Sequence, residues 1–353
     1  MFSLNRRNIR IAVSPHCNSD CLYCDGQKSR KINKPGAMED FRRQPLKSGV
    51  IDTKTFLEII KALHSSGFDG MTLTGGEPLL NPDWDKIVSQ SHRIGMSRIG
   101  VTTNGLLLNN YLHENKYLPR ELTLLTISLD TVDPFRFQAI TGKDKFKEIL
   151  HGLKLARRAN PTLLIRANKI LLHSDMNSLL EYIDYVDNTH LIDEINLLNL
   201  ILKDRESKNF FEKEFISAAE VLDFFQKNTK YRFSMDDKYE YSAVLSSGLK
   251  IILKDTNYTL RNKKCDRCPI YCQEGYFTVR VATDGNVTTC PDYWAKLPYI
   301  DGLLEIKTGK LYHKINDLMQ ALTQAEKKNT LGEFFRRYDV KLINNNEINY
   351  KFI

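Results

Sequence analysis

The chain has 353 residues, of which 42% are hydrophobic and 27% are charged, and its formal net charge at pH 7 is +8, values ordinary for a soluble globular protein with a sizeable core. No segment approaches the run of about 18 apolar residues that a membrane span requires, and the first residues lack the features of a signal peptide, so we expect a cytoplasmic protein without a membrane partner. The basic residues are dispersed rather than gathered in a stripe with aromatics, which argues against nucleic acid as a partner.

Short β-rich segments alternate with amphipathic helical patterns from the N-terminus to Leu200. We predict strands at Ile9–Val13, Gly70–Thr74, Ile99–Thr103, Leu122–Leu129, Leu163–Ile170 and Asp193–Leu200. We predict helices at Thr53–Ser66, after Asn81 and Pro82 as N-cap and first turn, at Lys145–Ala159 and at Asn177–Val186. Alternation repeated about six times indicates a parallel sheet of the α/β class. Because no pattern supplies two further units, we predict a partial (β/α)6 TIM barrel with its active site at the carboxyl ends of the strands.

The character of the chain changes after Leu202. A charged stretch is followed by an amphipathic helix at Ser217–Lys227, by hairpin-like material around Tyr239–Leu253 and by a second group of cysteines. A helical pattern then runs through Arg337. We therefore predict three parts, which are a barrel at 1–205, an auxiliary domain at 206–300 and a C-terminal helical segment at 301–353.

Three of the seven cysteines, Cys17, Cys21 and Cys24, have the spacing C-x-x-x-C-x-x-C directly after the first strand. An odd number of cysteines in a reducing compartment favours metal binding or catalysis over disulfides. A zinc site would lack one ligand unless His16 or a remote residue supplied it. A second interpretation, that the cysteines are simply buried apolar side chains, conflicts with the polar residues between them. An iron–sulfur cluster is the third interpretation, since three thiolates on a four-iron cubane leave one iron open to a ligand.

The second predicted strand ends in Gly75-Gly76-Glu77-Pro78. A tight turn is the simple interpretation, because glycine and proline are ordinary turn residues. The more specific one is a ligand site, since glycines let the backbone approach a ligand closely, and Glu77 or nearby carbonyls can accept hydrogen bonds from an ammonium group.

Together with "VTTNG" and "ISLDTVDPFRFQAITG" at the next two strand ends, these motifs resemble the radical S-adenosylmethionine (radical SAM) superfamily. The resemblance implies that Cys17, Cys21 and Cys24 bind a catalytic [4Fe-4S] cluster and that S-adenosyl-L-methionine is the second cofactor. One electron then cleaves the sulfonium, and the adenosyl radical takes a hydrogen atom from the substrate. An electron donor such as flavodoxin or ferredoxin is implied as well. The implied cofactor contacts are Tyr23, Gly75, Gly76, Glu77, Thr103, Asn104 and Ser128.

The second cysteine group contains Cys265, Cys268, Cys272 and Cys290. On spacing alone these residues could form a tetrahedral zinc site. Beside a radical SAM core, an auxiliary [4Fe-4S] cluster is the favoured interpretation. The segment "RVATDGNVTTC", which ends at Cys290, predicts a hairpin with Asp284-Gly285 as its turn.

Most of the chain resembles the GTP cyclase family of molybdenum-cofactor synthesis. That resemblance implies substrate contacts at Arg10, Thr102, Arg166, Asn196 and Arg280. However, Thr72, Asn196 and Thr278 stand where that family has arginines. Each lost arginine removes a charged hydrogen bond of about 1.5–3 kcal/mol, so we do not expect GTP cyclisation. We expect a small anionic or nucleotide-like substrate in a specialised biosynthetic pathway.

Two alternatives come from other classes of function. One is a maturase that modifies a ribosomally synthesised peptide, although Cys17 lies close to the start of the chain for an enzyme with a preceding leader-peptide domain. The other is a zinc-stabilised binding protein on a barrel scaffold. Zinc without acid-labile sulfide would favour the binding protein.

Overall fold

A single large sheet organises the part of the chain that the structure describes. The computed structural model describes residues 8–24, 52–65, 68–201, 208–235, 240–254, 260–262, 279–283, 287–288 and 340–342. Within these residues, eleven strands form one sheet in the order β12-β11-β1-β2-β3-β4-β5-β6-β9-β8-β7. A separate antiparallel pair joins β10 (Leu260–Asn262) to β13 (Val340–Leu342).

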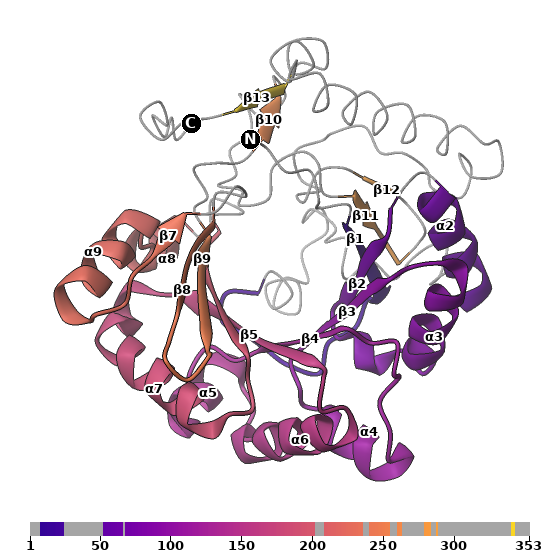
Figure 1. Cartoon of the computed structure of the whole chain (residues 1–353), viewed down its shortest axis with the longest axis horizontal. Coiled ribbons are helices and arrows are strands. Elements are labelled where there is room, and N and C mark those ends of the chain that lie inside the picture. The colour runs from indigo at the N-terminus through magenta and orange to yellow at the C-terminus, as the bar shows by residue number, and fades with distance from the viewer. Residues whose placement is uncertain are drawn as a thin grey trace, which may run out of the picture.

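The six predicted strands are the centre of the sheet and follow one another in chain order. They are parallel throughout, which confirms the predicted α/β class. Their bounds are β1 (Asn8–Ser14), β2 (Gly70–Gly75), β3 (Arg98–Thr103), β4 (Leu124–Ser128), β5 (Leu164–Leu171) and β6 (Glu194–Asn199). Figure 1 shows these strands as an arc with α2, α3, α4, α6 and α7 on its outer side, as a partial TIM barrel requires.

The helices pack their apolar faces on the outer side of the arc. In α2, for example, the buried side chains are Phe56, Ile59, Ile60 and Leu63, which recur at helical spacing. The helices of this shell are α2 (Thr53–Ser65), α3 (Trp84–Ile94), α4 (Leu108–Asn115), α5 (Pro134–Thr141), α6 (Phe146–Ala159) and α7 (Leu179–Thr189), followed by α8 (Lys208–Glu214) and α9 (Ala218–Asn228). Two 3-10 turns, η2 (Pro78–Leu80) and η3 (His173–Ser178), follow β2 and β5.

The start of α3 corrects one expectation. Asn81 is not its N-cap; the helix begins at Trp84 with Asp83 in the capping position, because η2 occupies the preceding residues. Asn81 instead ends η2, and its side-chain nitrogen donates to the carbonyl of Val13 over 2.8 Å. The residue therefore ties the turn after β2 to the end of β1.

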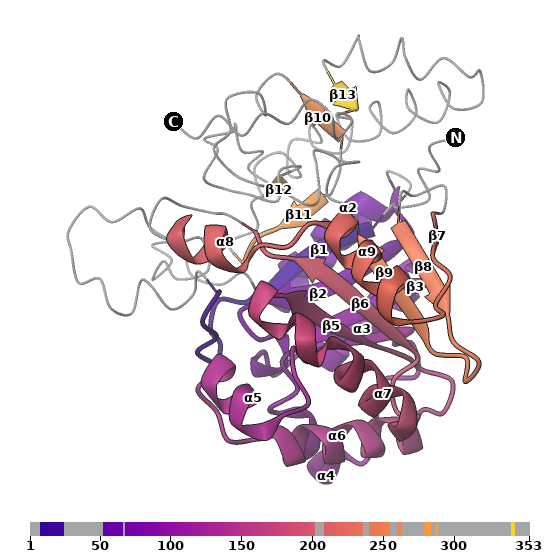
Figure 2. The ribbon, with the colours of Figure 1, turned by 90° about the vertical axis from the view of Figure 1, so that its left-hand side faces the viewer.

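The sheet extends beyond six parallel strands at both edges. At one edge β9 (Lys250–Lys254) is parallel to β6 and forms the predicted hairpin with β8 (Glu240–Val244), which also pairs with β7 (Ser234–Met235) (Figure 2). At the other edge β11 (Val279–Val281) is parallel to β1 and antiparallel to β12 (Val287–Thr288). The predicted turn at Asp284-Gly285 lies outside the described residues. Strands from the later half of the chain thus flank the barrel.

The described helices contain no candidate for a membrane span, since none combines the necessary length with an apolar composition.

Candidate active site

The cysteine loop follows β1 and carries Cys17, Cys21 and Cys24, each partly exposed. Burial raises the pKa of the Cys17 thiol and raises that of Cys21 to about 12. Charge on the neighbouring thiols adds to both rises, so the three sulfurs lie within electrostatic reach of one another. Three thiolates in such a loop need a compensating positive group, because burial disfavours their charged form.

The Gly75–Gly76 turn holds the first part of this loop by backbone contacts. The amide of Gly76 donates to the carbonyl of Ser14 over 2.8 Å, and the amide of Glu77 donates to the carbonyl of His16 over 2.7 Å. A Cβ atom on Gly76 would lie closer than 3.0 Å to the carbonyl oxygen of His16, and Gly75 has a φ of +132°. Only glycine fits this approach, so the turn after β2 and the loop of Cys17 form one unit.

Helix α5, which sequence reasoning did not predict, holds the second part of the loop. The amides of Asp20 and Leu22 donate to the carbonyls of Thr141 (2.9 Å) and Ile140 (3.0 Å) at its C-terminus. Pro134 and the capping carboxylate of Asp133, which accepts from the Phe135 amide over 2.8 Å, start this helix. These residues were the available signal for α5.

Glu77 joins the ends of β2 and β3. Its side chain is 1% exposed, and its carboxylate accepts from the Thr103 hydroxyl (2.6 Å) and from the amides of Asn104 (2.8 Å) and Leu79 (3.0 Å). Burial raises the pKa of this carboxyl, while the three hydrogen bonds oppose the rise. Both carboxylate oxygens are therefore engaged within the protein, which leaves the carbonyls of the turn as the groups available to an ammonium ligand.

Asn104 links this junction to the cysteine loop. Its side-chain nitrogen lies 2.8 Å from Asn18 Oδ1 and 3.6 Å from Cys17 Sγ, and its side-chain oxygen accepts from the Leu106 amide. The end of β3 thus reaches the first cysteine directly.

Tyr23 connects the loop to the far side of the barrel. Its hydroxyl donates to the carboxylate of Asp130, which follows β4 and also accepts from the amide of Ile170 over 2.7 Å. Lys169 donates to the backbone carbonyl of Asp130 and lies 4.9 Å from the centre of the Tyr182 ring. Burial raises the pKa of Asp130 and lowers that of Lys169, so loss of hydration outweighs their mutual attraction.

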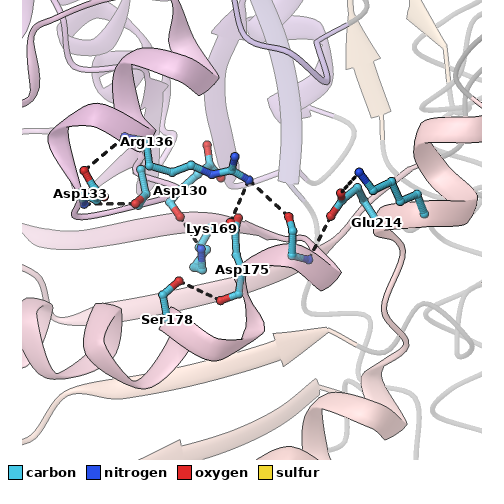
Figure 3. Close-up of polar contacts among 10 residues, drawn as sticks. Asp130, Asp133, Arg136, Lys169, Asp175, Ser178 and Glu214 are labelled. Carbon is cyan, nitrogen blue, oxygen red and sulfur yellow. Dashed lines mark hydrogen bonds and ion pairs between the residues drawn. The ribbon is translucent and has the colours of Figure 1, made fainter.

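Figure 3 shows the polar cluster around Lys169. Arg136 reaches from α5 to Asp175 in η3 over 2.9 Å, and Glu214 of α8 accepts from the amide of Ser174 over 3.0 Å. Sequence reasoning missed this cluster, because its members are distant in the sequence and belong to no motif. The cluster fixes α5, and with it the second half of the cysteine loop.

The three cysteines offer the thiolate donors that an iron–sulfur cluster uses. Within the described ranges, no three His, Cys, Asp or Glu side chains converge closely enough to hold one ion. A cubane distributes its thiolate ligands over separate irons and so tolerates wider spacing. The loop supplies three thiols and is anchored from both sides, which satisfies the donor requirement of such a cluster.

The barrel encloses a polar cavity of about 610 Å³. On β5, Arg166 and Asn168 line it, whereas the alternating residues Ala167 and Lys169 are buried under the helices. Four of the five predicted substrate residues are part of the lining, namely Arg10, Thr102, Arg166 and Asn196. The fifth, Arg280, lies beside Arg10 in the parallel register of β1 and β11.

The arginines of the cavity are in different environments. Arg166 donates through its Nε and Nη2 atoms to the carboxylate of Glu194, so its charge is neutralised within the barrel. Arg10 and Arg280 are neighbours in register on the same face of the sheet, and both also have interactions of their own.

The remaining predicted site residues divide into two groups. Ser128 ends β4 opposite Asn168, and Thr103 is buried in the Glu77 junction. The cysteines of the second group lie outside the described residues, as does Thr278; they are Cys265, Cys268, Cys272 and Cys290. The auxiliary cluster therefore stays a prediction.

Comparison with known proteins agrees with this geometry. Residues 11–173, which include the cysteine loop, the Gly-Gly turn and all of β2 to β5, match the sequence model of the radical SAM superfamily. The match covers the barrel from β1 to η3. The superfamily and the partial barrel predicted from sequence are thus confirmed, and membership supports an enzyme.

Curated relatives of this chain are named for molybdenum-cofactor synthesis or for GTP 3',8-cyclase. A probable GTP 3',8-cyclase of Saccharolobus solfataricus is 25% identical, with 80% of this chain and 82% of that protein covered. GTP 3',8-cyclase of Synechocystis is 29% identical over 61% of this chain and 60% of that protein. Molybdenum cofactor biosynthesis protein moc-5 of Caenorhabditis elegans is 28% identical over 54% of this chain, and the chain spans only 30% of its length.

Among solved structures, anSMEcpe with bound AdoMet shares the fold. The TM-score is 0.56 at 14% sequence identity, with 88% of this chain and 83% of that chain covered. This likeness concerns the fold alone.

Proposed function

We propose that the chain is a radical SAM enzyme that reductively cleaves S-adenosylmethionine and abstracts a hydrogen atom from a small anionic or nucleotide-like substrate. The observation that carries the proposal is the double anchoring of the loop that contains the three cysteines. Gly76 and Glu77 hold it from β2, and the C-terminus of α5 holds it from the other side.

In this proposal Cys17, Cys21 and Cys24 would hold a [4Fe-4S] cluster. When bound, the cluster supplies one electron to the sulfonium of S-adenosylmethionine, which yields 5'-deoxyadenosine after hydrogen abstraction. A low-potential donor such as a flavodoxin or ferredoxin would provide that electron.

The residues of the chain would bind and orient the second cofactor. Carbonyls of the Gly75–Gly76 turn are suited to accept from its ammonium group, since the carboxylate of Glu77 is engaged elsewhere. Tyr23 lies on the cysteine loop, where it donates to Asp130, and Ser128 lies two residues before Asp130 at the end of β4. Glu77 and Asn104 act as positioning residues, because they fix the rim to which the first cysteine is attached.

The charges of the cavity support an anionic group on the substrate. Arg10 and Arg280 lie side by side in register on β1 and β11, and opposite charge attracts most strongly where water is excluded. Relatives named GTP 3',8-cyclase point to a nucleotide-like molecule. Thr72 and Asn196 line the cavity as neutral residues, and Arg166 is paired with Glu194, so the site is less suited to a triphosphate.

Anaerobic reconstitution tests the proposal. The full chain is loaded with iron and sulfide, reduced with dithionite in the presence of S-adenosylmethionine, and assayed for 5'-deoxyadenosine. We expect a brown protein that releases this product. Cys21→Ala should lose product release and bind less iron, and Leu22→Ala, whose side chain in the same loop is 55% exposed, should retain both. A protein that stays colourless, or that binds zinc without acid-labile sulfide, would contradict the proposal.

A further inference from the structure

Two asparagines on neighbouring strands form a pair on the cavity wall. Asn168 of β5 and Asn196 of β6 are partners in the parallel register, and both line the cavity. The side-chain nitrogen of Asn196 donates to the side-chain oxygen of Asn168 over 3.0 Å. The two amides therefore fix one another's orientation.

The pair leaves hydrogen-bonding capacity unused. Asn196 is 5% exposed, and its Oδ1 atom is buried without a hydrogen-bond partner among the described residues. The Nδ2 atom of Asn168 likewise donates no hydrogen bond within the described part of the chain. A side-chain amide has both an acceptor and donors, and buried polar groups are rarely left unpaired. Rotating both amides by 180° exchanges these roles but still leaves one donor and one acceptor.

The surroundings of the pair carry no net charge. Two residues earlier on the same strands, Arg166 and Glu194 neutralise each other in the same register. On the other side of Asn196, the register partner on β9 is the apolar Ile252, which also lines the cavity. A charged ligand group would gain little at this wall, whereas a neutral group with a matching donor and acceptor would satisfy both amides.

We propose that the Asn168–Asn196 pair recognises a neutral amide edge of the substrate, an N–H beside a C=O, as found in a nucleobase lactam or a carboxamide side chain. This inference rests on the proposed function, in that it takes the cavity to be the substrate site, and it names a specificity-determining pair within that site. The anionic end of the same molecule would then face the β1–β11 side, where Arg10 and Arg280 lie.

A purely structural role for the pair has a different consequence for stability. Replacing Asn196 with leucine removes its buried unpaired acceptor but also its 3.0 Å bond to Asn168. Because Asn168 is only partly buried and can turn to water, the two effects oppose each other and we expect a small change in melting temperature. Asn199 provides the matched control, because it lies on the same strand, is also buried, and its amide donates to the carbonyl of Ile216 over 2.7 Å on the opposite face. Asn199→Leu loses the fully buried bond to Ile216 and should lower the melting temperature more than Asn196→Leu does.

The test measures binding of two probe pairs to the reconstituted full chain by calorimetry. Uridine is compared with 3-methyluridine, and a glutamine-containing tripeptide with the same tripeptide dimethylated on the side-chain amide. We expect one unblocked probe to bind about tenfold more tightly than its blocked partner, and we expect Asn196→Leu, but not Asn199→Leu, to abolish that difference. Discrimination in the uridine pair identifies a nucleobase, and discrimination in the tripeptide pair identifies a carboxamide.

Three results would overturn the inference: equal binding of blocked and unblocked probes, no binding of any probe, or a lower melting temperature in Asn196→Leu with discrimination intact. Release of 5'-deoxyadenosine separates this inference from the proposed function. A wild-type chain that discriminates the probes but releases no 5'-deoxyadenosine would contradict the proposed function alone.

Discussion

The backbone amide of Gly76 donates a hydrogen bond to the carbonyl of Ser14 over 2.8 Å. Ser14 is the last residue of β1, and Cys17 follows three positions later. The turn after β2 therefore fixes the point from which the cysteine loop departs, and the position of the first thiol depends on a residue that has no side chain of its own.

Gly76→Ala should displace this loop. The new Cβ would overlap the carbonyl oxygen of His16, a backbone atom that cannot rotate away. Overpacking of this kind costs about 1–3 kcal/mol, and we expect lower iron content after reconstitution and a lower free energy of unfolding. Gly70→Ala is the control, since its Cβ would meet chiefly the end of the flexible Arg98 side chain. Equal iron loading in the two variants would show that the loop does not need the close approach.

Glu77→Gln should weaken the junction between β2 and β3. A glutamine side chain can replace only one of the two carboxylate oxygens, so either the Thr103 hydroxyl or the Asn104 amide loses its acceptor. Loss of a hydrogen bond to a charged group predicts a decrease of about 1.5–3 kcal/mol in the free energy of unfolding. A double-mutant cycle with Thr103→Val, followed by urea unfolding, measures the coupling. Additive effects would mean that the 2.6 Å contact contributes no stability.

Tyr23→Phe should loosen the second half of the cysteine loop. The Tyr23 hydroxyl donates to Asp130, which is buried and has a pKa raised chiefly by that burial. Among the described residues, the Asp130 carboxyl group then keeps only the Ile170 amide as a hydrogen-bond partner. We expect a loss of about 1.5–3 kcal/mol in the free energy of unfolding and weaker cluster absorbance. Tyr117→Phe, which removes an exposed hydroxyl bonded to Asp85, is the control and should change neither quantity.

The repeated strand–helix pattern was sufficient to predict the barrel. All six central strands lie within two residues of their predicted ends, because buried parallel strands read as apolar runs between helical patterns. The flanking strands β9 and β11 could not be assigned to the sheet in the same way. Each pairs with a strand distant in the sequence, β6 and β1 respectively, and β9 enters the sheet from its hairpin with β8 rather than directly from a helix.

The candidate site was predictable where it depends on motifs. The cysteines and the Gly-Gly turn are contiguous patterns, and the structure brings them together. The groups that anchor the loop do not form a contiguous pattern in the sequence; they are Asp130, Lys169 and the C-terminus of α5. Their role comes from tertiary contacts between separate strands and helices. The ion pair of Arg166 with Glu194 was likewise hidden, because the two residues are 28 positions apart and meet only through the register of β5 and β6.

Lys169 predicts a pH dependence of stability. Its side chain is 2% exposed, and burial lowers its pKa below the ordinary value of 10.5. Between the lowered value and 10.5 the folded chain binds fewer protons at this position than the unfolded chain, so the free energy of unfolding rises with pH across that window, by at most about 1.4 kcal/mol per pH unit. Lys169→Met removes the titrating group, and wild type should therefore gain stability relative to this variant between pH 7 and pH 10.

Urea unfolding of both proteins at several pH values measures this difference. Lys227→Met is the control, because Lys227 is exposed and pairs with Asp223 on the surface of α9, and its difference from wild type should stay nearly constant. The hydrogen bond from Lys169 to the Asp130 carbonyl is lost in the variant, so we also expect weaker cluster absorbance, as in Tyr23→Phe. A wild-type advantage that shrinks as the pH rises would show that the ammonium form of Lys169 is favoured by folding, contrary to its burial.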